Sequence, residues 1–151
     1  MQSLNLPAFP FRIREEEDKK QIFDIFRRKF VSLTPEEWVR QHFLAWLHVQ
    51  KQYPLGLIAV EVSLKYHWMQ KRADAIIYGT DGQPLMIVEC KAPSVKLSQD
   101  VFDQIARYNF NFGVKYLLVT NGLVHYCCLK KGEGNDWVFL EEVPDYPSLN
   151  G

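Results

Sequence analysis

The chain has 151 residues, of which 47% are hydrophobic, and its 18 basic residues are balanced by 18 acidic ones. This length suits one domain with a substantial core. The zero net charge argues against a protein that coats nucleic acid through charge alone, but it leaves room for a localised site. The three cysteines form no zinc-binding pattern, no apolar run approaches the ~20 residues of a membrane helix, and the N-terminus does not resemble a secretion signal. We therefore expect a cytoplasmic protein with reduced thiols and no membrane partner.

The first third of the chain is predicted to contain two helices. The charge run from Arg14 to Lys20 is typical of a solvated helix start, and the apolar spacing from Ile22 to Phe30 predicts a helix with one buried side. The basic residues Arg27 to Lys29 suit the end of that helix or, alternatively, a phosphate-binding patch. The second helix is more clearly marked, because Thr34-Pro35-Glu36-Glu37 supplies an N-cap, a proline at the first helical position and a glutamate three residues after the cap. It should run from Pro35 to about Lys51.

From residue 57 onward the pattern mostly has the period of strands. Asp81-Gly82 and Asn121-Gly122 are signals for tight hairpins, and Ser98 to Phe110 has the apolar spacing of a helix. The predicted strands are Leu57 to Leu64, Ala73 to Tyr78, Leu85 to Glu89, Tyr116 to Thr120, Leu123 to Leu129, and a short edge strand from Trp137 to Leu140. This order predicts an α/β domain with a mixed β-sheet flanked by helices. We expect one domain over residues 1–151, with its core at about 33–130.

The residues that carry chemistry lie on the hairpin around Asp81-Gly82. If these two residues form the centre of the turn, Asp74 lies opposite Glu89 with Cβ atoms about 5 Å apart, and Lys91 shares the face of Glu89. Opposed carboxylates repel each other, and a cation between them would relieve the repulsion. Magnesium is a natural candidate, because it accepts one or two carboxylates and keeps several waters. With Lys91 orienting a water and stabilising charge on a phosphate, the pattern predicts metal-assisted phosphodiester hydrolysis.

A competing interpretation treats the same residues as a surface charge ladder. In that case Asp74 and Glu89 face solvent and are neutralised by Arg72 and Lys91. An Asp followed at a distance by Glu-x-Lys is short and occurs often by chance. The surrounding strands are rich in Ile, Val and Met, which favours a buried position and hence the metal site.

The residues Asp74…Glu89-Cys90-Lys91 resemble the PD-(D/E)xK nuclease motif, with Ala73 where the name of the motif has proline. More specifically, the chain is similar to the N-terminal nuclease domain of the R subunit of type I restriction enzymes. The resemblance extends from about residue 9 to residue 128. The stretches that carry it are Ile22-Phe23-Asp24, Leu33-Thr34-Pro35-Glu36-Glu37-Trp38-Val39-Arg40-Gln41, Arg72-Ala73-Asp74, Val88-Glu89-Cys90-Lys91-Ala92-Pro93, Gln104-Ile105-Ala106-Arg107-Tyr108 and Thr120-Asn121-Gly122. It implies a restriction-endonuclease-like fold and cleavage of DNA that depends on Mg²⁺ or Mn²⁺.

The resemblance also implies roles for single residues. Asp74 and Glu89 would be metal ligands, and Lys91 the catalytic lysine. Glu37 matches a first-helix glutamate that often completes the metal site, although its position three residues after Thr34 also suits a capping box.

Further residues would complete the site around these ligands. The backbone carbonyl of Cys90 would be an additional metal ligand, while its thiol fills the core. Gln104 and Tyr108 match a Gln-x-x-x-Tyr pair near the active site, with Gln104 close to the reacting phosphate, and Arg72 would contact DNA. Gln104 and Tyr108 also share a helix face and could be a plain surface or packing pair.

Other patterns limit the function. His125 with Cys127 or Cys128 could suggest a thiol nucleophile, but an apolar strand without a third partner favours packing. The sequence has no G-x-x-x-x-G-K-[ST] loop, so we expect a nuclease module that does not use ATP. Its expected partners are DNA and other restriction-system subunits.

Two alternatives keep the fold without independent cleavage. One is a non-catalytic DNA-binding module. The other is a partner-dependent subunit of a larger restriction or repair complex, whose exposed aromatics, such as Trp68, Phe110 or Trp137, would form the interface.

Overall fold

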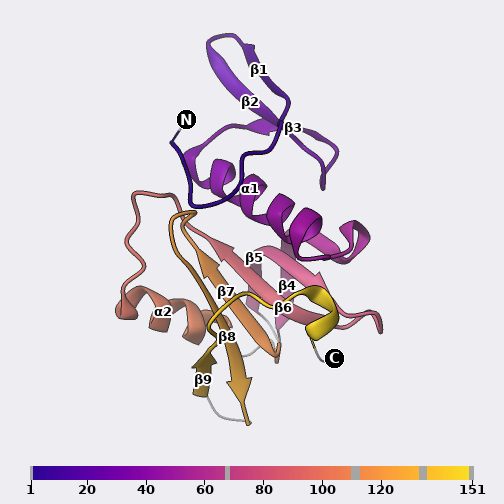
Figure 1. The fold of residues 1–151 in the computed structure, drawn as a ribbon, viewed down its shortest axis with the longest axis vertical. Helices are drawn as coiled ribbons and strands as arrows, with labels where there is room; N and C mark the ends of the chain where they lie inside the picture. The colour runs from indigo at the N-terminus through magenta and orange to yellow at the C-terminus, as the bar shows by residue number, and fades with distance from the viewer. Residues whose placement is uncertain (1, 67–68, 110–112, 133–135, 150–151) are drawn as a thin grey trace.

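The computed structural model describes residues 2–66, 69–109, 113–132 and 136–149, with the backbone alone at 63–66, 69–71, 108 and 109. These residues form a three-stranded sheet, a six-stranded sheet and two α-helices (Figure 1). The strands of the first sheet are β1 (Ile13–Glu16), β2 (Lys19–Asp24) and β3 (Lys29–Ser32). Those of the second are β4 (Ile58–Tyr66), β5 (Met69–Tyr78), β6 (Pro84–Cys90), β7 (Tyr116–Thr120), β8 (His125–Lys131) and β9 (Asp136–Phe139). The helices are α1 (Pro35–Gln50) and α2 (Gln99–Asn109), and two short 3-10 helices are η1 (Leu55–Leu57) and η3 (Tyr146–Ser148).

The six-stranded sheet has the order β4-β5-β6-β7-β8-β9 and is mixed. β6 and β7 run parallel, joined by the segment that contains α2, and the other neighbours run antiparallel. One face packs against α1 in an apolar cluster that includes Phe43, Leu47 and Met86. The other face packs against α2. There Phe102 and Ile105 contact the residues of the same strands that face away from α1. The predicted α/β fold with a mixed sheet flanked by helices is confirmed.

Helix α1 begins where the sequence predicts. The backbone N–H of Glu37 donates to the Thr34 hydroxyl at 3.0 Å, and Pro35 occupies the first turn. The helix ends at Gln50, and the chain turns at Tyr53, whose buried ring packs against it. The cap and the first turn therefore fix where the acidic residues of α1 lie.

The N-terminal sheet corrects the prediction of a helix over Ile22 to Phe30. The charge run is a hairpin, in which Glu15 lies opposite Lys20 and Glu16 opposite Lys19, so opposite charges face each other across two strands. Its two-residue turn, Glu17 and Asp18, has the positive φ angles of a tight hairpin, 52° and 64°. The apolar residues that follow alternate along β2 rather than lining one side of a helix.

The hairpin between β5 and β6 has the predicted register next to the site. Ala75 pairs with Val88 and Ile77 with Met86, but a bulge follows Ile77, so that Tyr78 pairs with Pro84. The turn therefore has more than two residues. The bulge offsets its extra residue, so the strands keep the predicted pairing next to the site. The second hairpin has a four-residue loop, residues 121–124, so β8 begins at His125 instead of Leu123.

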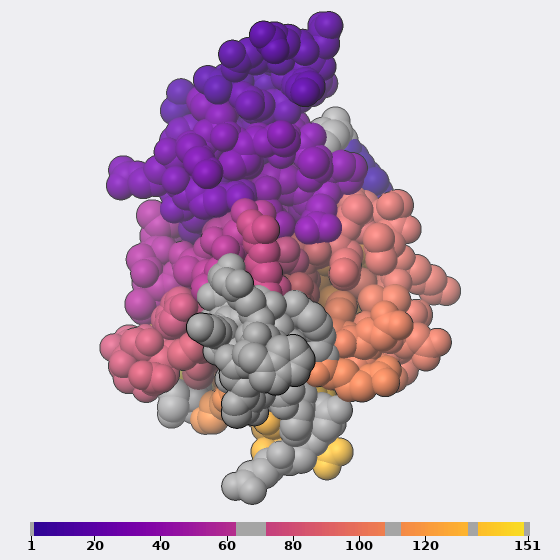
Figure 2. Space-filling view, turned by 180° about the vertical axis from the view of Figure 1, so that it is seen from behind, coloured from indigo at the N-terminus to yellow at the C-terminus, as the bar shows by residue number. Residues whose placement is uncertain are grey.

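Viewed from behind, the N-terminal sheet and α1, in indigo and purple, form the upper part of the molecule above the six-stranded sheet (Figure 2). The first residues extend to the far sheet, because the backbone N–H of Asn5 donates to the carbonyl of Gly122 at 2.8 Å. No helix among the described residues is long and apolar enough to cross a membrane.

Candidate active site

Two carboxylates, Glu61 of β4 and Asp74 of β5, lie opposite each other on neighbouring strands of the six-stranded sheet. Glu61 lies between two residues that pair with β5 on either side of Asp74, and the β5–β6 pairing begins next to Asp74, with Ala75 opposite Val88. Glu61 has a φ of 53°, which is unusual for a non-glycine residue inside a strand and is the kind of local strain that often occurs at functional sites. The sheet thus brings together acidic side chains that would repel one another without nearby positive charge.

Both oxygens of the Asp74 carboxylate accept hydrogen bonds from the protein. Oδ2 accepts a hydrogen bond from the backbone N–H of Cys90 at 2.7 Å, and Oδ1 accepts one from Arg40 at 3.0 Å. Cys90 lies between Glu89 and Lys91, so the side chain of Asp74 lies against the Glu-x-Lys segment at the end of β6. The sequence prediction that these two strand segments come together is consistent with this contact.

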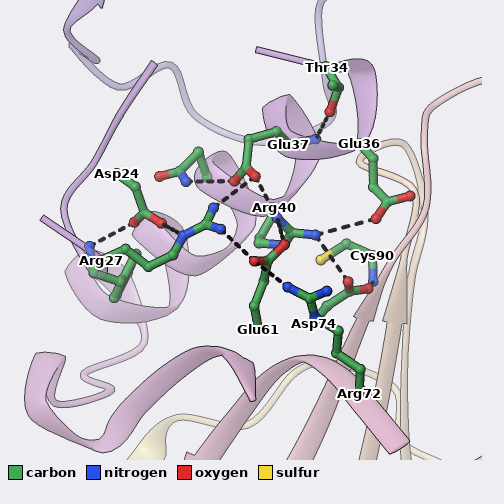
Figure 3. Close-up of polar contacts among 12 residues, drawn as sticks. Asp24, Arg27, Thr34, Glu36, Glu37, Arg40, Glu61, Arg72, Asp74 and Cys90 are labelled. Atoms are coloured by element: carbon green, nitrogen blue, oxygen red, sulfur yellow. Dashed lines mark hydrogen bonds and ion pairs between the residues drawn. The ribbon is translucent and has the colours of Figure 1, made fainter. Parts of the chain in front are cut away.

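Arg40 of α1 supplies the positive charge nearest to Asp74 (Figure 3). Its side chain is buried, and the residue is only 5% exposed. Nη2 lies 3.0 Å from Asp74 and 3.3 Å from Glu36, while Nη1 lies 2.5 Å from Glu37 and 3.8 Å from Glu61. One guanidinium group therefore contacts carboxylates from α1, β4 and β5.

Arg27 connects the N-terminal sheet to the same cluster. It forms an ion pair with the buried carboxylate of Asp24, and its other nitrogens lie 2.8 Å from Glu37 and 2.9 Å from Glu61. Arg72 reaches Glu61 from the exposed side at 2.8 Å. Arg27 therefore does not end a helix, as the sequence analysis proposed, but joins two sheets and α1.

We call this set the arginine–carboxylate network. Its members are the carboxylates of Asp24, Glu36, Glu37, Glu61 and Asp74 and the guanidinium groups of Arg27, Arg40 and Arg72. Five negative charges are opposed by three positive ones, which leaves an excess of two negative charges. The pKa values respond to this environment: burial raises the pKa of Glu36 and the charge of Asp74 raises it further, while Arg40 and Lys91 oppose the shift.

The network suits a hard divalent cation in its chemistry. Carboxylate oxygens are the donors that Mg²⁺ prefers, and an excess of two negative charges matches one such ion. Among the residues that the structure describes, no group of three or more His, Cys, Asp and Glu side chains is arranged to enclose a metal ion. An ion held by one or two carboxylates and several waters fits this arrangement, whereas a closed zinc-type cage does not.

The comparison with protein families gives a match over residues 35–144. It is to the type I restriction enzyme R protein N terminus (HSDR_N). The chain belongs to this family. The matched range contains α1, α2 and the whole six-stranded sheet, and it begins after the N-terminal sheet. No curated protein matches the chain. Membership in the family suggests a nuclease-like module.

The first-helix glutamate that faces Asp74 differs from the one that the sequence analysis selected. The carboxylate of Glu37 accepts hydrogen bonds from Arg27, Arg40 and Gln41, so it is enclosed by donors and does not close a capping box. Glu36 lies one residue earlier and shares the Nη2 atom of Arg40 with Asp74. Its spacing of four residues from Arg40 is a signal that could have indicated this pairing.

The predicted DNA contacts are less tightly connected to the site. The side chain of Gln104 is exposed on α2, and among the described residues no hydrogen bond joins it to Asp74 or Lys91. The backbone of Tyr108 lies on the same helix, and its side chain is outside the described residues. Arg72 is exposed and bound to Glu61, at the edge of the network.

All three cysteines are buried, which disfavours a role as nucleophiles. Cys90 is buried, and burial raises the pKa of its thiol well above the usual value, so the thiolate is disfavoured. Burial likewise raises the pKa values of Cys127 and Cys128 to about 12. The nearby His125 is bonded to Thr120 at 2.7 Å, in agreement with the packing role favoured by the sequence.

Of the aromatics considered for an interface, Trp68 and Phe110 lie outside the described residues. Trp137 is half-buried and packs against the cluster under α2.

Proposed function

We propose that this chain is a metal-dependent DNA endonuclease module that hydrolyses phosphodiester bonds. The contact that carries the proposal is the hydrogen bond from the Cys90 backbone to Asp74, because it joins the Asp segment and the Glu-x-Lys segment at one point of the sheet. The family match supports it independently, since it covers both segments. Mg²⁺ or Mn²⁺ is the proposed cofactor.

Asp74 and Glu89 would hold the ion, with the carbonyl of Cys90 as a further oxygen ligand. A bound ion would stabilise charge on the phosphate and lower the pKa of a coordinated water. Glu36 is a better candidate than Glu37 for an additional ligand, because Glu37 is enclosed by Arg27 and other donors.

Lys91 would act on the water and on the phosphate rather than on the ion. Its backbone is fixed beside the site, since its N–H donates to the carbonyl of Thr120 on the neighbouring strand at 2.8 Å. An ammonium group next to a carboxylate-bound ion would neutralise charge that develops on the phosphate in the transition state. Arg72, Gln104 and Tyr108 are proposed to contact the DNA backbone, and other restriction-system subunits are proposed partners.

A second candidate function is a module that binds DNA but needs a partner before it cuts. One observation favours it: both carboxylate oxygens of Asp74 already accept hydrogen bonds from the protein. A partner that displaces one of these donors would then be required to open the site.

The test is cleavage of supercoiled plasmid by the purified chain with Mn²⁺ or Mg²⁺ and without ATP. Lys91→Ala should lower the cleavage rate by about 10²–10³, which is the usual loss on removing one group that stabilises transition-state charge. Lys131→Ala is the matched control, because Lys131 is an exposed lysine at the end of β8. Cleavage that persists in excess chelator, or a Lys91→Ala variant as active as Lys131→Ala, would contradict the proposal. Metal-independent DNA binding without cleavage would support the second candidate.

A further inference from the structure

Arg40 places a positive charge against Asp74, where the proposed function also places the metal ion. We propose that Arg40 is a positioning residue that competes with the divalent ion for Asp74, neutralising the site before metal binds and moving off Asp74 when it does. This inference rests on the proposed function, because it assumes that Asp74 is a metal ligand. It concerns Arg40 of this chain, which neither the motif nor the family description assigns.

The contacts of Arg40 divide between its two terminal nitrogens. Nη1 is the anchored side, with Glu37 at 2.5 Å, and Glu37 is itself held by Arg27 and Gln41. Nη2 is the shared side, with Asp74 at 3.0 Å and Glu36 at 3.3 Å. Loss of the Asp74 contact would therefore leave the guanidinium bound to Glu37.

The third nitrogen of the Arg40 guanidinium shows that this group does not make all of its possible hydrogen bonds. Nε of Arg40 is buried and has no hydrogen-bond partner, and a buried donor of this kind is destabilising. Arg40 also lines a cavity of about 550 Å³ together with Arg27, Thr34, Glu36 and Glu61. The guanidinium thus has both an unsatisfied donor and space beside it.

Electrostatics then couple the two cations. Before metal binds, Arg40 and the other guanidinium groups leave the network with two excess negative charges, and Arg40 shields Asp74. A divalent ion on Asp74 repels Arg40 and weakens its bond to that carboxylate, and by reciprocity Arg40 weakens the binding of the ion. Arg40 therefore stabilises the metal-free fold at the cost of metal affinity.

The first experiment compares Arg40→Gln with Arg27→Gln by calorimetric titration with Mn²⁺. Both variants remove one guanidinium from the network, but Arg27 contacts Asp24, Glu37 and Glu61, not Asp74. Arg40→Gln should bind Mn²⁺ about tenfold more tightly than wild type, as expected when one charge-assisted hydrogen bond to the ligand is removed. Arg27→Gln should tighten binding by less than about threefold, because only its longer-range charge is lost.

The two variants should also differ in how much Mn²⁺ raises their melting temperatures. Arg40→Gln should melt lower than wild type without metal, and added Mn²⁺ should raise its melting temperature by more than it raises that of wild type. Equal affinities in Arg40→Gln and wild type, or equal gains in both variants, would overturn the role of Arg40 while leaving metal binding intact. If wild type and both variants bind no Mn²⁺, the proposed function fails together with this inference.

A second measurement uses the wild-type chain and does not depend on the folding of a variant. The Nε–H signals of arginine are resolved by ¹⁵N NMR, and Arg40→Lys assigns the signal of Arg40. Addition of Mg²⁺ should shift the Nε–H signal of Arg40 and speed its exchange with solvent, while that of Arg27 changes little. An unchanged Arg40 signal under conditions in which Mg²⁺ raises the melting temperature would show that Arg40 does not move, and would overturn the proposal.

Discussion

The two sheets of this chain are stabilised in different ways. The six-stranded sheet has a buried apolar side against each of its helices, and the family match covers it completely. In the N-terminal sheet all four residues of β1 are exposed, and its cross-strand partners include opposed charges. Guanidinium groups also lie over the rings of Phe23 and Phe30. The six-stranded sheet is thus held mainly by apolar burial, whereas the N-terminal sheet has one fully buried apolar residue in its strands, Ile22, and is attached to the rest of the molecule through charged groups.

That attachment is the arginine–carboxylate network, and Arg27 is its link. Arg27 lies between the strands of the N-terminal sheet, yet its partners include Glu37 on α1 and Glu61 on β4. The proposed active site therefore lies where the two sheets meet, and disturbance of the N-terminal sheet should reach Asp74 through Arg40. The difference between the sheets can be tested by equivalent substitutions in each.

The largest difference is expected for isoleucines. Ile77→Ala on β5 should lower the free energy of unfolding by about 4 kcal/mol, because a fully buried side chain leaves a cavity. Ile13→Ala on β1, where the side chain is 47% exposed, should cost less than about 1 kcal/mol. Urea unfolding of both variants measures the difference. Similar losses would mean that β1 is buried by contacts other than those described.

A smaller effect is expected for Arg27 and Arg14, two arginines of the N-terminal sheet region. Arg27→Gln should lower the free energy of unfolding by about 3 kcal/mol, because it leaves the buried carboxylate of Asp24 without its ion-pair partner. Arg14→Gln should change it by less than about 1 kcal/mol, since its pair with Glu16 is exposed. Chemical denaturation at low salt gives both values, and a stable Arg27→Gln protein would show that the network does not join the sheets.

The smallest effect concerns pH and the N-terminal segment. The ring of His42 on α1 is covered by Phe11, and burial lowers the pKa of His42 below its ordinary value near 6.5. The unfolded chain therefore takes up a proton first, so this contribution to stability is present above pH 6.5 and is lost as the pH falls below it.

His42→Gln removes this contribution. Its free energy of unfolding should fall less between pH 7 and pH 5 than that of wild type, with fluorescence as the measure. Burial lowers the pKa of His125 as well, so some acid sensitivity should remain in the variant. An identical slope in both proteins would indicate that Phe11 does not shield His42 in solution.

The sequence predicted the six-stranded sheet and α1 because their signals are local. Apolar alternation marks the strands, and Thr34 with Pro35 marks the helix start, so each element is specified by residues that are neighbours in the chain. The β5–β6 register was also predicted correctly. The prediction placed Asp81-Gly82 at the centre of the turn, whereas the structure has a longer turn and a bulge at Ile77 that compensates for it.

The residues that the sequence could not predict act over long separations. Nothing near Arg40 indicates that it meets Asp74, 34 positions later, or that Glu61 bridges Arg27 and Arg72. The sequence pattern predicted a metal ion beside Asp74, and in the structure the guanidinium of Arg40 lies against that carboxylate. The N-terminal hairpin was misassigned because the spacing of its apolar residues fits the period of a helix as well as that of a strand. In the structure a two-residue turn with positive φ angles at Glu17 and Asp18 makes the segment a hairpin.

The backbone hydrogen bond from Lys91 to Thr120 can form only late in synthesis of the chain. β6 acquires its parallel neighbour only after α2 and β7 have been synthesised, because a parallel pair requires a crossover connection. The backbone beside Lys91 therefore stays an open edge until residue 120 has left the ribosome and the crossover has closed, a non-local step that is slow compared with helix formation. A nascent chain that already carries Asp74, Glu89 and Lys91 would still lack the fixed geometry that cleavage requires.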